Sequence, residues 1–124
     1  MDLNQITLPC TDLERSVAFY RRLGFRQIVS SPPRYARFEC PSGPTFSLHL
    51  VERAAPGTGV VVYFEVSDVD EKVRELEAEG VRFEMAPTDQ PWLWREARCR
   101  DPDGNELCIY HAGKNRRFPP WRID

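Results

Sequence analysis

Hydrophobic and polar positions alternate along short segments of the chain and recur at helical spacing along two longer segments. Residues 3–9 alternate strictly, which predicts a half-buried strand. A helix follows, because a hydrophobic stripe at helical spacing comes after a capping pattern of Thr11 and Glu14 and stops at Gly24. Proline-rich turns then separate further segments, which predict strands at about residues 25–30, 34–40 and 45–52. This order of strand, helix and three strands makes a first βαβββ module.

The same pattern recurs 56 positions later, where the segment Thr11–Arg26 aligns without a gap with Ser67–Arg82. The order of the first module is repeated by a strand at 59–66, a helix from Asp68 to Glu79, and strands at about 81–86, 93–100 and 105–111. We therefore predict an α+β fold of two tandem βαβββ modules in one domain, residues 1–124. The first module, a linker, the second module and a docking tail are expected at residues 3–52, 53–58, 59–111 and 112–124.

The repeat also marks the positions where chemistry is expected. Gln5 in the first strand maps onto Val61 by the same offset. Aligning the hydrophobic residues of the last strands maps His49 onto Cys108, whereas aligning the preceding turns on their glycines maps Ser47 onto Cys108. Strand alternation puts Ser47 and His49 on one face, so both alignments present the same face. The equivalent inward positions are therefore expected to be Gln5, His49, Val61 and Cys108.

Composition narrows the classes of partner. The net charge of -2 at pH 7 gives no reason to expect nucleic acid or an acidic membrane surface as a partner. No signal peptide opens the chain, and no apolar run reaches the ~20 residues that a membrane span needs. The four cysteines show no CxxC spacing, so a zinc ribbon is not indicated and free thiols are expected. We therefore expect a cytoplasmic protein.

Several short motifs occur in the order and spacing of one protein family. They are Thr11–Ser16 followed by Phe19 and Tyr20, Leu23–Phe25, Val66–Asp70 and Asp101–Asn105. Together with the paired βαβββ pattern, they make residues 3–111 resemble the vicinal oxygen chelate superfamily, which includes glyoxalase I, bleomycin and fosfomycin resistance proteins, and extradiol dioxygenases. The resemblance implies eight strands in two curved half-barrels that shelter a site, usually across a homodimer. It also implies that metal ligands, where present, come from the four inward positions.

These inward positions depart from the metal site of that family, whose metal-dependent members usually carry His, Glu or Gln there. Val61 has no donor atom, and Cys108 stands where a glutamate is usual. Gln5, His49 and Cys108 remain as candidate ligands for a divalent ion (zinc, iron, manganese or nickel), and a set without a carboxylate suits oxygen-preferring ions poorly. A single inward histidine is more often a hydrogen-bonded pocket residue, and such a cysteine is more often a buried apolar filler. We therefore expect a pocket without a metal ion or other cofactor.

Further residues on the same face are candidates to line a small-molecule pocket. Trp92 and Trp94 would either wall a pocket for a planar ligand or pack at a dimer seam, and Tyr63 offers a hydroxyl group. The whole expected pocket comprises Gln5, Thr7, Ser47, His49, Val61, Tyr63, Trp92, Trp94, Cys108 and Tyr110.

Three features outside this set allow a structural or a functional interpretation. Alternating arginines would supply an anion contact or form a solvated face: Arg34, Arg37, Arg95 and Arg98. The segment Asp101–Asn105 lacks the later ligands of a calcium loop and predicts a hairpin turn. Phe118 and Trp121 in the tail are expected to cover a strand edge or to bind a partner subunit.

Three functions follow from these observations. The first is a small-molecule binding protein that resembles the resistance proteins and holds its ligand in an apolar, aromatic groove without a metal. The second is a divalent-metal-dependent lyase, isomerase or dioxygenase, with Gln5, His49 and Cys108 as ligands. The third is a metal-free enzyme that uses His49 as a general base. We favour the first, acting as a homodimer with no nucleic-acid or membrane partner.

Overall fold

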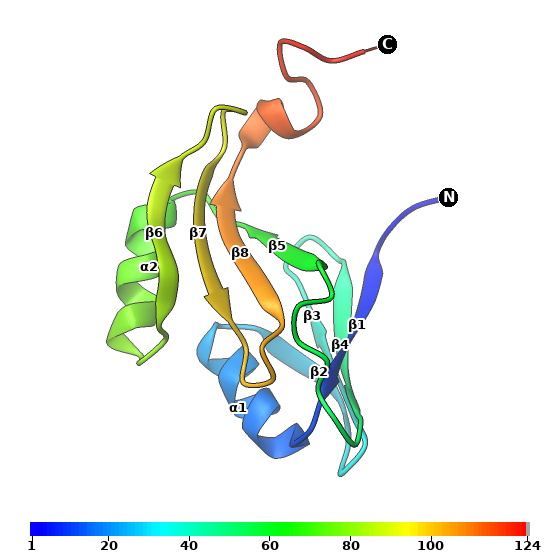
Figure 1. Ribbon diagram of the computed structural model, residues 1–124. Coiled ribbons are helices and arrows are strands. Elements are labelled where there is room, and N and C mark those ends of the chain that lie inside the picture. The colour runs from blue at the N-terminus through cyan, green and yellow to red at the C-terminus, as the bar shows by residue number, and fades with distance from the viewer. Residues whose placement is uncertain (124) are drawn as a thin grey trace. The chain divides into compact units, whose positions relative to one another are not determined.

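The computed structural model describes residues 1–123 as a succession of strands and helices that repeats once (Figure 1). The first set comprises β1 (Gln5–Cys10), α1 (Leu13–Arg22), β2 (Arg26–Ser31), β3 (Tyr35–Glu39) and β4 (Thr45–Leu50). The second set comprises β5 (Val61–Glu65), α2 (Val69–Ala78), β6 (Phe83–Asp89), β7 (Arg95–Arg100) and β8 (Glu106–His111), followed by a 3-10 helix, η1 (Gly113–Arg116). The predicted α+β fold of two βαβββ modules is confirmed.

Internal contacts divide the chain into two compact units. The first unit is Met1–Thr58 together with Asp101–Asn105, and the second is Gly59–Arg100 together with the segment from Glu106 onward. The turn between β7 and β8, which the sequence pattern assigns to the second module, therefore belongs to the first unit. Within residues 1–123, neither α-helix has the length and the apolar run that a membrane crossing requires.

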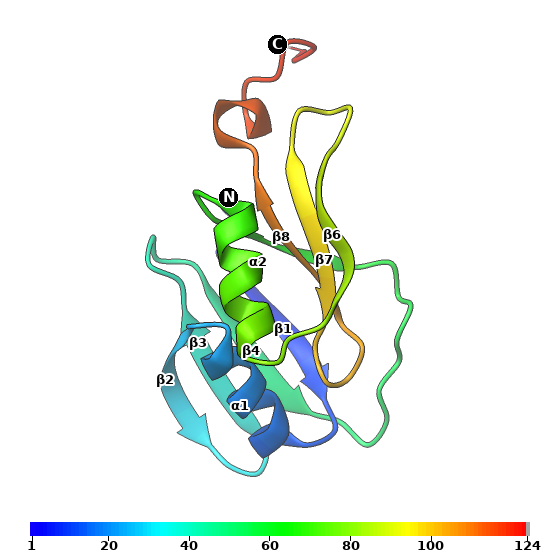
Figure 2. The same cartoon turned by 90° about the vertical axis from the view of Figure 1, so that its left-hand side faces the viewer.

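The first unit is a four-stranded mixed sheet with α1 packed on one face (Figure 2). The strand order is β1-β4-β3-β2, with β1 parallel to β4 and the other pairs antiparallel. Ala36 and Phe38 of β3 and Phe46 and Leu48 of β4 are buried, and the rings of Phe38 and Phe46 stack with their centroids 5.1 Å apart. Tyr20 of α1 joins this core, with its ring centroid 5.0 Å from that of Phe46. Polar side chains are left on the opposite face of the sheet.

The second unit repeats this arrangement in the strand order β5-β8-β7-β6, with α2 packed on β6, β7 and β8. Val69 and Val73 of α2 pack against Ala97 of β7 to form its core. Because side chains alternate along a strand, the neighbours of Ala97, which are Glu96 and Arg98, turn to the face away from α2. That face therefore receives charged residues from the middle of a central strand.

Both α-helices begin one residue later than the sequence pattern predicts. Asp12 is the N-cap of α1 and accepts a hydrogen bond from the backbone N–H of Arg15 at 3.0 Å, and Asp68 caps α2 in the same way. Thr11, the predicted cap, instead donates its hydroxyl proton to the carboxylate of Asp103 at 2.6 Å. The capping prediction for Thr11 is therefore wrong, because a carboxylate 92 positions away in the chain engages its side chain.

The segment Asp101–Asn105 is a hairpin turn, as predicted, and its acidic side chains are buried in the first unit. Asp101 accepts the hydroxyl proton of Tyr20 through Oδ2 at 2.6 Å. Its other oxygen, Oδ1, accepts the backbone N–H groups of Asp103 and Asn105, each at 3.0 Å. The carboxylate oxygens of this turn satisfy protein donors, so the turn has a structural role in the first unit.

The sheet registers select one of the two alignments of the repeat. Gln5 pairs with Thr45 across β1 and β4, and Val61 pairs with Glu106 across β5 and β8. Since Gln5 and Val61 are equivalent in the repeat, Thr45 is equivalent to Glu106, which lies 61 positions later.

The inward positions of the last strands change accordingly. Ser47 is the counterpart of Cys108, and His49 is the counterpart of Tyr110. The alignment of His49 with Cys108 is wrong because a slip of two residues leaves every side chain on the same face, so hydrophobic pattern alone does not detect it. The glycines of the preceding turns fix the register correctly.

The tail after β8 forms η1 and then an extended end. The indole N–H of Trp94 donates to the backbone carbonyl of Asn115 at 3.4 Å, and the guanidinium of Arg122 lies 4.6 Å from the ring centroid of Phe118. The side chains of Phe118 and Trp121 are 57% and 55% exposed. Docking of this tail on a partner subunit stays a prediction.

Candidate ligand-binding site

Three aromatic side chains gather at the face of the second sheet that turns away from α2. The ring of Tyr63 on β5 meets the rings of Tyr110 and Trp94 edge-on, with centroids 5.3 and 5.8 Å apart. Trp94 and Tyr110 lie 4.9 Å apart. Burial raises the pKa of the Tyr110 hydroxyl, whereas Tyr63 is 41% exposed. The cluster therefore offers an exposed tyrosine side chain on a packed aromatic base.

A buried carboxylate stands beside this cluster. Glu96 is 1% exposed, and its Oε2 accepts the indole N–H of Trp92 at 2.7 Å. Its Oε1 accepts a hydrogen bond from the guanidinium of Arg98 at 3.1 Å. Arg98 also donates to the hydroxyl oxygen of Tyr63 at 3.2 Å and lies over its ring. Glu96 thereby holds Trp92 and Arg98 in fixed orientations around one buried charge.

Trp92, Glu96 and Arg98 line a pocket of about 240 Å³ in the second unit, and Tyr63 lies outside its lining, in contact with Arg98. The walls of this pocket include Met85, Gln90, Trp92, Glu96, Arg98 and Glu106. The sequence pattern predicts Trp92 as a pocket residue but omits Glu96. A signal for Glu96 is present in the sequence, since its spacing of two residues from Trp94 and Arg98 puts all three on one face of a strand.

Cys108 lies in this sheet as a protonated thiol. Its side chain is fully buried and packs with Tyr110, with Val61 beside them. Burial, reinforced by the carboxylate of Glu96, raises the pKa of Cys108 to about 12. Because the thiolate is the nucleophilic form of cysteine, Cys108 is a poor nucleophile near neutral pH.

The site residues predicted in the first module lie on the polar face of the first sheet. Gln5 donates from Nε2 to the hydroxyl oxygen of Ser47 at 2.8 Å, and its Oε1 accepts the hydroxyl proton of Thr45. Ser47 is fully buried, whereas Thr7 and His49 are exposed. The structure therefore brings Gln5 and Ser47 into contact and leaves His49 open to solvent.

The donor chemistry of these positions does not fit the metal site that the family resemblance implies. Val61 has no donor atom, the side chain of Cys108 is fully buried, and the amide of Gln5 is engaged by two hydroxyl groups. His49 is not equivalent to Cys108 in the sheet registers. Within residues 1–123, no group of three or more His, Cys, Asp or Glu side chains is arranged to hold a metal ion.

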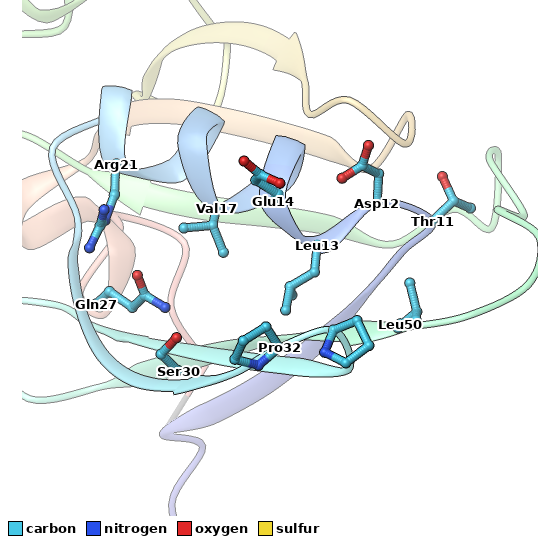
Figure 3. A pocket seen from close by; sticks show the side chains of 11 residues that line it. Thr11, Asp12, Leu13, Glu14, Val17, Arg21, Gln27, Ser30, Pro32 and Leu50 are labelled. Atoms are coloured by element: carbon cyan, nitrogen blue, oxygen red, sulfur yellow. The ribbon is translucent and has the colours of Figure 1, made fainter.

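A second concavity, a groove of about 640 Å³, runs along α1 in the first unit (Figure 3). Leu13 and Val17 of α1 point toward the strand and turn that carry Ser30 and Pro32. The sequence pattern assigns Leu13 and Val17 to the core stripe of the helix, so it does not predict the groove. Its lining contains no aromatic ring and no buried charge, which makes it a weaker candidate than the pocket of the second unit.

Known proteins of similar sequence and structure share this architecture. Protein YraH of Bacillus subtilis (strain 168) is 32% identical over 128 residues, which covers 89% of this chain and 98% of YraH. The crystal structure of a glyoxalase/bleomycin resistance protein/dioxygenase from Nocardioides has a TM-score of 0.78 at 27% identity, covering 100% of this chain and 90% of that one. A bleomycin-binding protein complexed with bleomycin has a TM-score of 0.75 at 22% identity, covering 90% of this chain and 98% of that one. At that identity, the likeness shows the fold alone.

A family comparison covers most of the chain. Residues 2–109 match the Glyoxalase/Bleomycin resistance protein/Dioxygenase superfamily. The match spans both βαβββ sets and ends at Ile109 within β8. The chain therefore belongs to the Glyoxalase/Bleomycin resistance protein/Dioxygenase superfamily.

Proposed function

We propose that the chain is a small-molecule binding protein that holds a planar, aromatic organic compound at Tyr63 and Trp92 without a metal ion. The superfamily includes proteins of several activities, so the choice depends on the chemistry of this site. The observation that carries the proposal is an exposed aromatic surface beside the buried carboxylate of Glu96 and its half-buried partner Arg98. The aliphatic Val61 and the fully buried Cys108 at two of the four ligand positions support binding without a metal.

The dimensions of the site indicate which part of a ligand it holds. A volume of about 240 Å³ is somewhat below that of a pocket for a drug-sized ligand, so it accepts one ring or a short substituent. The remainder of the ligand would stack on Tyr63, and an aromatic pair of this kind contributes about 0.5–1.5 kcal/mol beyond area burial. The hydrogen bond from Trp92 to Glu96 fixes the indole before binding, which lowers the entropy lost on association.

The indole N–H signals of the tryptophans give a direct test by ¹H–¹⁵N NMR. Bleomycin is the first probe, because a bleomycin-binding protein shares this fold, and planar aromatic compounds such as naphthalene and quinoline derivatives follow. We expect saturable shifts of the Trp92 and Trp94 signals and an unchanged signal from Trp121, which lies in the tail. Saturable shifts confined to Trp121, or none with any probe, would overturn the proposal.

Variants separate a site from a general hydrophobic surface. Tyr63→Ala removes the exposed stacking ring and should weaken binding about three- to tenfold, whereas Trp121→Phe should leave it unchanged. Glu96→Gln keeps the shape of the side chain but removes the charge that orients Arg98, so the Trp92 signal should move even without a ligand. Equal loss of affinity in the Tyr63 and Trp121 variants would indicate non-specific adsorption.

The absence of a metal is tested by elemental analysis of the purified protein. The measurement is repeated after incubation with zinc, manganese, iron and nickel, and on the variant His49→Ala. We expect substoichiometric metal in every case. A stoichiometric ion that is lost in His49→Ala would establish the metal-dependent alternative and overturn the metal-free part of the proposal.

We also propose that the protein is a cytoplasmic homodimer. The exposed tail aromatics Phe118 and Trp121 support association, and the free thiols of its cysteines fit a reducing compartment. Sedimentation equilibrium of the full chain tests the assembly, with a dimer expected. A monomer at micromolar concentration would contradict it.

A further inference from the structure

Two arginines occupy equivalent positions on the open faces of the two sheets. Arg37 of β3 pairs with Ser47 of β4, and Arg98 of β7 pairs with Cys108 of β8. Because Ser47 is the counterpart of Cys108, the two arginines occupy the same register position in their sheets. Each guanidinium lies over a tyrosine ring with its carbon 5.5 Å from the ring centroid. The repeat has therefore retained a cation at this position in both units.

The partners of the two guanidinium groups differ. Arg98 is neutralised by the buried carboxylate of Glu96 at 3.1 Å. The position equivalent to Glu96 in the first unit is Tyr35. Its hydroxyl oxygen accepts a hydrogen bond from the Nε–H of Arg37 at 2.9 Å, and it accepts none from the two Nη groups. Within residues 1–123, neither Nη group of Arg37 has an acceptor. The guanidinium of Arg37 thus presents an unsatisfied pair of donors.

Neighbouring acidic groups do not supply the missing charge. Glu39, two residues along β3 on the same face, pairs with Arg26 at 3.7 Å. The residues across the sheet from Arg37 are Ser47 of β4, then Thr7 of β1, and Val29 of β2 on the other side, and all three are uncharged. This part of the face therefore carries an unpaired positive charge.

The hydroxyl group of Tyr35 supplies one more donor beside the guanidinium of Arg37. Ser47 is fully buried, so its hydroxyl proton needs an acceptor, and we assign that proton to the bond with the hydroxyl oxygen of Tyr35, 2.6 Å away. Tyr35 then accepts from both Ser47 and Arg37, and its own proton is left to donate outward. The same two donors favour the phenolate, and the bond from Ser47 is the largest cause of the lowered pKa of Tyr35.

We propose that Arg37 and Tyr35 form an oxyanion-binding site for the carboxylate or phosphate group of a small molecule. The two Nη groups supply the planar fork that binds two oxygens of one anion, and the Tyr35 hydroxyl supplies a third donor. His49, opposite Tyr35 in the sheet register, stands at the edge of this site. The site lies in the first unit, and it does not depend on aromatic binding at Tyr63.

Titrations with sodium acetate and with inorganic phosphate test the site and distinguish the two anion classes. The side-chain Nε–H of Arg37 is followed by ¹H–¹⁵N NMR at constant ionic strength. We expect a saturable shift with at least one anion, and at least a tenfold loss of affinity in Arg37→Gln, because charge-assisted hydrogen bonds are lost. Arg37→Lys keeps the charge but not the fork and should bind several-fold more weakly than wild type.

Matched variants decide whether the site is specific. Tyr35→Phe removes the third donor while retaining the ring, and it should weaken binding several-fold. Arg22→Gln removes an exposed charge of α1 and should leave the affinity unchanged. The absence of a saturable shift with both anions, or equal losses in Arg37→Gln and Arg22→Gln, would overturn the proposal. The Trp92 indole signal reports separately on the proposed aromatic site, so failure of one is distinguishable from failure of the other.

Discussion

Replacement of Asp103 by alanine should destabilise the first unit severely. The side chain of Asp103 is 2% exposed, and its Oδ1 accepts the backbone N–H of Thr11 at 3.1 Å and the Thr11 hydroxyl at 2.6 Å. Its Oδ2 accepts the hydroxyl proton of Ser16, a fully buried residue, at 3.3 Å. Arg15 adds an ion pair at 3.5 Å, which is weak because half of its side chain is exposed. Asp103→Ala therefore leaves one buried donor, the hydroxyl of Ser16, and two partly buried donors of Thr11 without this acceptor.

The magnitude follows from these contacts. Hydrogen bonds to a charged group contribute about 1.5–3 kcal/mol each, and removal of the carboxylate recovers part of its desolvation cost. A net loss of about 3–5 kcal/mol in the free energy of unfolding is expected for Asp103→Ala. Asp68→Ala is the matched control, since it removes an exposed helix cap that accepts one bond, from Glu71, and should lose about 1 kcal/mol.

Urea unfolding followed by far-ultraviolet circular dichroism provides the measurement, with the slope compared between variants. The double variant of Asp103 and Ser16 adds a coupling test: a coupling free energy of about 1 kcal/mol or more is expected, because the two side chains share a buried hydrogen bond. A loss below about 1 kcal/mol in Asp103→Ala, or no coupling with Ser16→Ala, would refute this account of the turn.

Three further predictions concern the ionisable groups of the sheets. The pKa of Cys108 is raised from 9.0 to about 12, so the folded state retains the thiol proton after the unfolded state has lost it. The free energy of unfolding should therefore fall as the pH rises from 9 toward 12. In Cys108→Ala it should fall less steeply over that range. Iodoacetamide near neutral pH should modify the partly exposed Cys40 before Cys108, as followed by peptide mass spectrometry, and equal rates would contradict the burial of Cys108. Ser47→Ala should raise the pKa of Tyr35, measured by ultraviolet difference titration, and an unchanged value would show that Ser47 is not the donor.

Features that depend on near neighbours could be predicted from the sequence. Gly24 and Gly80 end the helices with φ values of 99° and 90°, a conformation that glycine adopts without strain. The cap at Thr11 could not be predicted correctly, because the carboxylate of Asp103 that engages it lies in a distant turn. The local sequence at Thr11 and Asp12 offers two competent caps, and only the fold decides between them.

Part of the site could likewise be predicted from local sequence, and the rest depends on contacts between residues that are distant in the chain. Strand alternation alone places Tyr63 and Cys108 on one face, and the sheet pairs them as neighbours. Spacing gives the face of the strand on which Glu96 lies, but its burial could not be predicted, since it depends on contacts with Trp92 and Arg98 in the fold. The sequence offers both Ser47 and His49 as the counterpart of Cys108, and only the hydrogen-bonded register of both sheets decides for Ser47.

The central claim is that the chain binds an aromatic molecule at Tyr63 and Trp92 without a metal ion. Its most direct test is the NMR titration of the indole N–H of Trp92 with bleomycin and planar aromatic probes, carried out on protein kept in excess chelator. The account predicts saturable shifts of the Trp92 signal that persist in chelator and weaken in Tyr63→Ala. Binding that appears only after zinc, manganese, iron or nickel is restored would contradict it.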